Sequence, residues 1–221
     1  HLTGAPKHGV GPMDVALTLV AALFPNGFVK NRVMEFFGEG IASLPVEFRN
    51  GIDVMTTETA CLSSIWQTDD AVREEARAAA SLGIDAGREA AYEALAPLSI
   101  AYYDRLVELD LSEVVPMIAL PFHPSNAMPI AEFKQNAEAI LRELDAKVKE
   151  QYPKLSMPSL TEKLRGDGFH ADQGEIAGCA GGTYDNLCMA ANILSGKSIG
   201  DGAFTLNCYP GSMPAALALL R

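Results

Sequence analysis

The residue whose surroundings most clearly suggest chemistry is Cys179, in the run GEIAGCAGGTYDNL over residues 174–187. An apolar pair, Ile176–Ala177, precedes a glycine-rich turn, and a run compatible with a helix begins at Thr183. Glycines at a turn let the backbone come very close to a ligand. Ligands of α/β proteins bind at the carboxyl ends of strands, which is where we expect this thiol to point. A single cysteine does not define a reaction, so its surroundings have to.

A second candidate is Glu58, in the run RNGIDVMTTETACLSSIW over residues 49–66. At helical spacing Glu58 lies beside an apolar face rather than opposite it. That face is formed by Ile52, Met55, Thr59 and Leu62. A carboxylate beside a buried face requires a partner or a ligand, because its desolvation is costly. The alternative is that Glu58 reaches solvent or caps a neighbouring loop, and periodicity alone favours this alternative.

The other three cysteines, Cys61, Cys188 and Cys208, form no recognisable ligand motif. The sequence contains no C-x-x-C pair and no histidine–cysteine spacing typical of a zinc site. A framework of disulfides is not expected at this density, so we predict reduced thiols and a cytoplasmic location. We expect these three residues to be core or near-core thiols.

The composition argues against several classes of function. With a net charge of −11, the chain is not expected to bind nucleic acid or anionic membranes, since both require basic patches. The longest apolar run, Val15–Phe24, is too short to cross a bilayer. The chain starts at His1 without a signal-peptide pattern and stops at Arg221 inside an apolar helical pattern. We therefore expect a piece of a longer protein.

Helical and extended patterns alternate along the chain and must position the two candidates. Helices are predicted at Val15–Phe24, Ser43–Phe48 with Ser43 as its cap, Asp70–Leu82, Arg88–Ala96, Glu132–Gln151, Tyr184–Leu194 and a final stretch reaching Arg221. Strands are predicted at Asn31–Phe37, Tyr102–Leu111, the residues before the Cys179 turn, and Ala203–Asn207. The proline-containing stretches Met117–Ile130 and Tyr152–Asp172 are predicted to lack regular structure. This alternation is typical of an α/β fold with mostly parallel sheets, and Ser112–Pro116 marks a domain boundary.

Six segments, in the same order, resemble the aconitase family of iron–sulfur hydro-lyases, which includes aconitate hydratase, homoaconitase and the large subunit of isopropylmalate dehydratase. They are LTGAPKHGVGPMDVALTLVAAL, NRVMEFFGEGIASLPVEFRNGIDVMTTE, YYDRLVELDLSEV, PFHPSNAMPI, IAGCAGGTYDNL and NCYPGS. The insert 134–172 is longer than the family's connection, which indicates a divergent branch. The resemblance implies three-layer α/β/α domains of the aconitase type, at residues 1–112 (the family's second domain) and 113–221 (its third, truncated).

The resemblance also implies roles for both candidates. Cys179 matches the first of three cysteines that hold the family's [4Fe–4S] cluster, in which one iron stays free to bind substrate. Glu58 matches the glutamate that hydrogen-bonds the iron-bound water and hydroxyl. The other two cluster cysteines fall outside this chain, so a cluster is expected in the full-length protein and not in this fragment. The family's asparagine is Val54 here, and its Thr-Asn pair is Ala180-Gly181.

The leading hypothesis is an internal fragment of a hydro-lyase, inactive by itself, that dehydrates and rehydrates a hydroxy-di- or tricarboxylic acid. Its expected partners are that small acid and the remaining domains of the same protein, including a swivel domain. The alternative, favoured by Val54, Ala180 and Gly181, is a homologue without a cluster that serves as a binding or interaction module. A third hypothesis makes Cys179 a nucleophile with His170 as its base.

Overall fold

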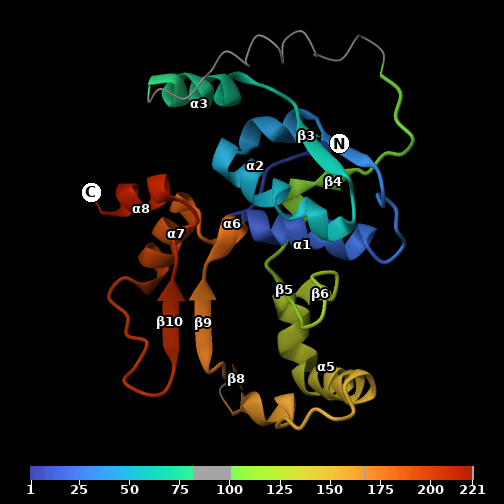
Figure 1. Cartoon of the computed structure of the whole chain (residues 1–221), viewed down its shortest axis with the longest axis vertical. Coiled ribbons are helices and arrows are strands. Elements are labelled where there is room, and N and C mark those ends of the chain that lie inside the picture. Colours follow the sequence, from blue (N-terminus) through green and yellow to red (C-terminus); the bar gives the residue numbers. More distant parts are fainter. Residues whose placement is uncertain (82–100, 167, 221) are drawn as a thin grey trace.

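The computed structural model describes residues 1–81, 101–166 and 168–220 (Figure 1). The elements up to residue 81 are β1 (Leu2–Thr3), α1 (Pro12–Leu23), β2 (Val33–Phe36), η1 (Glu39–Ser43), α2 (Val46–Asp53), η2 (Thr56–Thr59), β3 (Ser63–Trp66) and α3 (Asp70–Ser81). The predicted helices Val15–Phe24 and Asp70–Leu82 are therefore confirmed as α1 and α3 in the described residues. The predicted helix Arg88–Ala96 lies outside the described residues.

The second part of the chain contains the longest helix and the Cys179 turn. Its elements are β4 (Leu109–Asp110), η3 (Leu111–Glu113), β5 (Met117–Ala119), β6 (Ala127–Pro129), α5 (Ile130–Gln151), η4 (Leu160–Lys163), β7 (Leu164–Arg165), β8 (Gly168–Phe169), β9 (Gln173–Ile176), α6 (Gly178–Gly181), α7 (Tyr184–Leu194), β10 (Thr205–Cys208) and α8 (Met213–Leu219). Helix α7 has the bounds that the sequence predicts, and α5 and α8 are also confirmed.

Helix α1 lies at the centre of the molecule, with α2 on one side and the β5–β6 hairpin on the other (Figure 1). Asp14 is the acidic residue in the first turn of α1, and the N–H of Gly11 donates to its Oδ2 at 2.8 Å. The N–H of Met117 donates to the other oxygen of Asp14 at 2.7 Å, which ties β5 to α1. Val15 and Val20 are almost fully buried on this helix.

A hydrophobic core forms around α1. Its buried members are Leu2, Val10, Val15, Leu19, Leu23, Val29, Phe36, Ile41, Leu44, Ile52, Leu111 and Val114. These residues come from both sides of the segment 82–100, so the parts of the chain that flank it share one core. Burial of such side chains contributes roughly 1.5–3 kcal/mol each.

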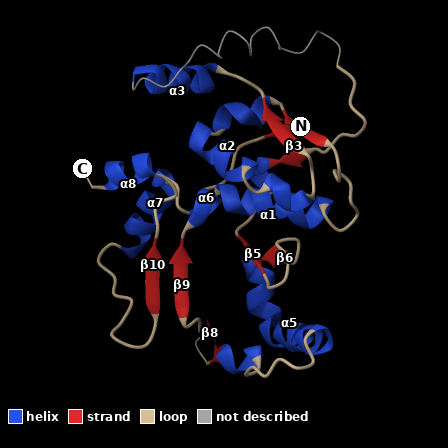
Figure 2. Ribbon diagram, in the orientation of Figure 1, coloured by secondary structure: helices blue, strands red, loops and turns tan. Residues whose placement is uncertain are grey.

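The described strands pair two by two, and three of the five pairs are parallel (Figure 2). Strand β2 pairs with β3, with Phe36 opposite Trp66; β9 pairs with β10, with Ile176 opposite Cys208; and β1 pairs with β4. The β5–β6 and β7–β8 pairs are antiparallel. Helices and short parallel sheets together agree with the predicted α/β class. The three-layer arrangement and the division into residues 1–112 and 113–221 stay predictions.

The continuous helical face predicted over Arg49–Trp66 is wrong. Helix α2 ends at Asp53, and η2 is followed by Ala60 in the left-handed region (φ 62°), after which the chain enters β3. The carboxylate of Asp53 accepts hydrogen bonds from Ser64 Oγ at 2.6 Å and from Trp66 Nε1 at 2.9 Å. These two bonds hold β3 against the end of α2, so the chain turns back instead of continuing as a helix.

Three further predictions need correction. Ser43 does not cap α2, which starts after Pro45; its hydroxyl instead donates to the carbonyl oxygen of Gly40 at 2.7 Å. Of the strand predicted over Tyr102–Leu111, only Leu109–Asp110 pairs as a strand; in the preceding segment Arg105 donates to the carbonyl oxygen of Phe28 at 2.8 Å. The stretches predicted to be irregular contain β5, β6, η4, β7 and β8.

In the part of the chain that the structure describes, no helix is both long enough and apolar enough to cross a bilayer.

Candidate functional site

Cys179 lies on the single-turn helix α6, directly beyond the carboxyl end of β9. The turn begins at Gly178, whose φ of +79° is in the left-handed region that favours glycine. The thiol of Cys179 is exposed and free. The sequence predicts a cysteine on a strand-to-helix turn at the end of a sheet, and the backbone has this form.

The end of the neighbouring strand supports the Cys179 turn. Because β9 and β10 are parallel, their carboxyl ends meet, and the N–H of Tyr209 donates to the carbonyl oxygen of Ile176 at 2.8 Å. The N–H of Gly211 donates to the carbonyl oxygen of Gly182 at 2.7 Å. A Cβ on Gly182 would lie 2.4 Å from the carbonyl oxygen of Tyr209, so this position requires glycine. The segments IAGCAGGTYDNL and NCYPGS therefore form one structural unit.

An acidic groove of about 930 Å³ opens beside Cys179. Helices α2, α3, α7 and α8 contribute to its walls, and its carboxylates are those of Glu47, Glu74, Glu75 and Asp185. No lysine or arginine is among the described residues that line it. The groove by itself therefore repels anions, so a carboxylic acid bound near Cys179 would need cationic groups from elsewhere.

Glu47 connects α2 to the first turn of α7 at the edge of this groove. The N–H of Asp185 donates to Oε1 of Glu47 at 3.4 Å. Burial raises the pKa of Glu47 above its usual 4.5, and the negative charge of Asp185 raises it further, while hydrogen bonds from the α7 backbone act in the opposite direction. At neutral pH this carboxylate therefore costs the folded state some stability.

Replacing Glu47 with glutamine is expected to stabilise the chain more near pH 7 than near pH 4. Since the folded-state pKa of Glu47 is raised, the associated stabilisation is complete below pH 4.5 and is lost as the pH rises through the folded-state pKa. The measurement is the thermal unfolding midpoint of the variant minus that of the wild type at each pH. Other carboxyl groups titrate in both proteins and cancel in this difference.

Glu143→Gln is the matched control, with the opposite sign. The Lys147 ammonium group holds the pKa of Glu143 below 4.5, so this stabilisation is present above pH 4.5 and is lost as the pH falls through the folded-state pKa. The unfolding midpoint of Glu143→Gln minus that of the wild type should therefore be lower near pH 7 than near pH 4. A pH-independent difference for Glu47→Gln would contradict the effect of burial and Asp185.

Glu58 lies in η2, which follows the C-terminal end of α2. Its neighbour Thr59 is buried, whereas the Glu58 side chain is 41% exposed. The carboxylate both reaches solvent and has a partner, because its Oε2 lies 3.8 Å from Nε2 of His123. The interpretation that Glu58 has a partner and the interpretation that it reaches solvent thus each hold in part.

The structure does not bring Glu58 and Cys179 into one groove. Glu58 is absent from the described residues that line the groove beside Cys179. Helix α6 contacts α1 and α2, so the two candidates lie near the same pair of helices. Val54, which replaces the family's asparagine, is the C-terminal cap of α2 and precedes η2. Among the described residues, no three side chains of His, Cys, Asp or Glu are grouped so that they could hold a metal ion together.

The geometry disfavours His170 as a base for Cys179. His170 precedes β9, where its N–H donates to the carbonyl oxygen of Lys163, and Cys179 follows the other end of that strand. Strand β9 alone spans about 10 Å at 3.3 Å per residue. A general base has to lie within hydrogen-bond reach of its nucleophile.

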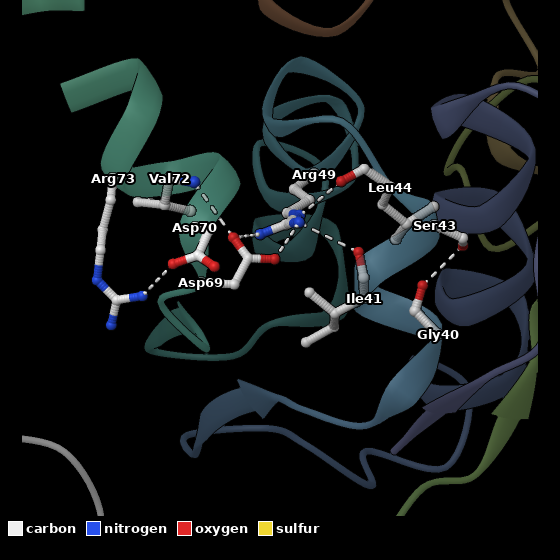
Figure 3. Close-up of polar contacts among 9 residues, drawn as sticks. All are labelled: Gly40, Ile41, Ser43, Leu44, Arg49, Asp69, Asp70, Val72 and Arg73. Atoms are coloured by element: carbon white, nitrogen blue, oxygen red, sulfur yellow. Dashed lines mark hydrogen bonds and ion pairs between the residues drawn. The ribbon is translucent and has the colours of Figure 1, made fainter. Parts of the chain in front are cut away.

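Two features of the site region were missed by reasoning from the sequence. One is His123, whose Nε2 lies 3.8 Å from Oε2 of Glu58. The other is Arg49, a buried arginine whose guanidinium group binds Asp69 and the carbonyl oxygens of Ile41 and Leu44 (Figure 3). The sequence signal available for the Arg49–Asp69 contact was an arginine within an apolar helical stretch, together with a pair of aspartates, Asp69 and Asp70, further along the chain.

Comparison with known proteins identifies the family. The model of the aconitase family (aconitate hydratase) matches residues 1–219, and the chain belongs to this family. The mitochondrial aconitate hydratase of Gracilaria gracilis is 31% identical over 223 residues, covering 100% of this chain and 25% of that protein. The phosphinomethylmalate isomerase of Streptomyces viridochromogenes is 29% identical over 206 residues, covering 90% of this chain and 23% of that protein.

A third relative is the large subunit of 3-isopropylmalate dehydratase from Picrophilus torridus. It is 25% identical over 198 residues, covering 90% of this chain and 37% of that protein. The chain thus spans between about a quarter and two fifths of the length of these relatives. The resemblance predicted from six sequence segments is confirmed.

Proposed function

We propose that this chain is part of a [4Fe–4S]-dependent hydro-lyase that dehydrates and rehydrates a hydroxy-di- or tricarboxylic acid. The observation that carries the proposal is the exposed, free thiol of Cys179 on a glycine-built turn at a strand end, in a chain of the aconitase family. The names of the relatives, aconitate hydratase and 3-isopropylmalate dehydratase, support the same class of reaction. Activity would belong to the full-length protein.

The residues around Cys179 fit one ligand of such a cluster. A thiolate suits soft iron, and this thiol is exposed. An added Cβ at Gly178 or at Gly181 would meet nothing within 4 Å, so these two positions beside Cys179 are open. The remaining ligands would come from parts of the protein outside this chain. When bound, the cluster would supply a Lewis-acidic iron for the substrate hydroxyl.

Glu58 is the residue that we propose for holding a proton at the reacting hydroxyl. Its carboxylate is 41% exposed and therefore accessible, and its Oε2 faces His123. An ionised carboxylate accepts hydrogen bonds from a hydroxyl or a water molecule, and a protonated one donates. The cationic groups that bind the substrate's carboxylates would come from other domains, including a swivel domain, because the groove beside Cys179 is acidic.

Anaerobic purification of the full-length protein tests the proposal. We expect a brown protein with iron close to the stoichiometry of one cluster, and loss of colour and iron in Cys179→Ser, because serine replaces the thiolate ligand. Cys208→Ser is the matched control, since Cys208 is also an exposed free thiol but matches no cluster ligand, and it should retain the iron. A colourless wild-type protein would overturn the proposal. That outcome would favour a binding module without a cluster, as Val54, Ala180 and Gly181 suggest.

A further inference from the structure

We propose that His123 is a positioning residue for the carboxylate of Glu58. His123 belongs to the loop between β5 and β6, and Glu58 belongs to η2, so the contact joins two separate parts of the chain. Nε2 of His123 lies 3.8 Å from Oε2 of Glu58. The inference rests on the role proposed above for Glu58.

The imidazole of His123 is held in one orientation. It stacks on the ring of Phe24, with ring centroids 3.8 Å apart and an angle of 21° between the planes. The N–H of Ser125 donates to Nδ1 of His123 at 3.1 Å, and the Ser125 hydroxyl lies 3.0 Å from the same nitrogen. The stack fixes the plane of the ring, and Ser125 fixes its rotation in that plane. Nε2 is the ring nitrogen that remains for Glu58.

The contact with Ser125 also determines the tautomer of the neutral ring. A backbone N–H can only donate, so Nδ1 must offer its lone pair. The hydrogen of the neutral imidazole is then on Nε2, which lies 3.8 Å from Oε2 of Glu58, beyond hydrogen-bond distance in this structure. A hydrogen-bond donor on a fixed ring therefore faces the carboxylate. Contacts of this kind are commonly long without substrate and shorten in the substrate complex.

The loop that carries His123 is itself ordered by hydrogen bonds. The N–H of Asn126 donates to the carbonyl oxygen of His123 at 2.9 Å, and the N–H of Leu120 donates to the carbonyl oxygen of Asn126 at 2.8 Å. Phe122 adopts a φ of +89°, which is strained for a residue other than glycine. The loop therefore holds an unfavourable backbone conformation directly before His123. Such strain persists where surrounding contacts fix the geometry.

Both partners remain accessible while they face each other. The side chains of His123 and Glu58 are 33% and 41% exposed. Since His123 meets Oε2, the other carboxylate oxygen of Glu58 stays available for a hydroxyl or a water molecule. His123 would restrict the rotation of the carboxylate and so reduce the cost of orienting it for reaction.

The first test is the tautomer of His123 in the chain, measured by long-range proton–nitrogen correlation spectra of histidine-labelled protein. His123→Phe assigns the signal. At a pH where the ring is neutral, we expect an unprotonated Nδ1 and a proton on Nε2. A proton on Nδ1 would overturn the inference, because the donor would then point away from Glu58. This measurement needs neither cluster nor substrate.

The second test is the activity of the full-length protein. His123→Phe keeps a ring for stacking but removes the donor, and should lower kcat roughly 10- to 100-fold with little change in KM, as for other residues that orient a site group. His123→Gln keeps an N–H close to the position of Nε2 and should recover part of the rate. His8→Phe, at an exposed histidine, is the control and should match the wild type.

The Glu58→Gln variant distinguishes the role of His123 from the role of Glu58. If His123 acts through Glu58, then His123→Phe should have no further effect in the Glu58→Gln background. Full activity of His123→Phe together with an impaired Glu58→Gln would overturn the role of His123 and leave the proposed function intact. Full activity of both variants would overturn the role of Glu58 and, with it, the role of His123. The iron content of the wild type and of Cys179→Ser would still test the proposed cluster independently.

Discussion

Replacing Arg49 with alanine is expected to lower the free energy of unfolding by about 3 kcal/mol, the lower end of the range for breaking a buried ion pair, because the Asp69 partner is 30% exposed. The Arg49 side chain is only 3% exposed. Its guanidinium group donates to Oδ1 and Oδ2 of Asp69 at 2.9 and 2.6 Å and to the carbonyl oxygens of Leu44 and Ile41 at 2.9 and 3.1 Å (Figure 3). Alanine would leave the two carbonyl groups without these donors.

The arginine also connects two helices. Oδ1 of Asp69 accepts the N–H of Val72 at 3.2 Å, so Asp69 caps the start of α3 while it binds Arg49 of α2. The hydrogen bonds from Arg49 hold the pKa of Asp69 below its usual 3.8. The stabilisation from this pair is therefore present above pH 3.8 and is lost as the pH falls through the folded-state pKa of Asp69.

Denaturant unfolding of the chain measures the Arg49 effect. Arg49→Lys should be nearly as harmful as Arg49→Ala, because an ammonium group cannot reproduce the planar fork that reaches all three partners. Arg142→Ala is the control: Arg142 forms an exposed pair with Glu138 four residues away, and its loss should cost at most about 0.5 kcal/mol. A cost below about 1 kcal/mol for Arg49→Ala would contradict the role assigned to the buried fork.

Replacing Gly182 with alanine is expected to destabilise the chain by about 3 kcal/mol, at the upper end of the range for overpacking. The new methyl group would lie 2.4 Å from the carbonyl oxygen of Tyr209, 2.7 Å from the nitrogen of Gly211 and 2.9 Å from the carbonyl oxygen of Gly178. All three are backbone atoms, so no side chain can rotate away. The turns that follow β9 and β10 would have to move apart, and Cys179, which lies on the first of them, would move as well.

Gly181→Ala is the matched control for Gly182→Ala. Gly181 is the preceding residue, and an added methyl group there would meet nothing within 4 Å. This substitution should be neutral or stabilising by up to about 1 kcal/mol, because alanine restricts the unfolded chain. The measurement is the unfolding midpoint of each variant, with hydrogen exchange at the Tyr209 and Gly211 amides as the local probe. Equal stability of the two variants would rule out the close approach of the turns.

The sequence predicts best where local signals and burial agree. Helix α7 has the predicted bounds, and α1 starts three residues before its prediction because Pro12 occupies its first position. The Cys179 turn was also predicted, since Gly178 and Gly182 occupy positions where the backbone demands glycine. The roles of Cys179 and Glu58 stay predictions, because the described residues do not bring the two side chains into one groove.

Predictions failed where side chains compete with the helical backbone. In η2, the hydroxyl of Thr59 donates to the carbonyl oxygen of Thr56 at 2.6 Å, and that of Thr56 donates to the carbonyl oxygen of Asp53 at 2.7 Å. Threonine bonds of this kind offer the backbone an alternative to a continuous helix. Apolar spacing alone could not reveal them, and Leu62, expected on the buried face, is 68% exposed. The His123 contact depends on how a distant hairpin packs, which no local pattern encodes.

The pairing of the first strand with β4 has a consequence for how the protein is made. Leu2 pairs with Leu109, and the amino group of His1 donates to the carbonyl oxygen of Val107 at 2.7 Å. At about 5 to 20 residues per second, a ribosome needs roughly 5 to 20 s to synthesise the partner of Leu2 after Leu2 itself. During that time the buried positions around β1 lack the residues that cover them. Synthesis order therefore makes this contact one of the late steps in assembling the core.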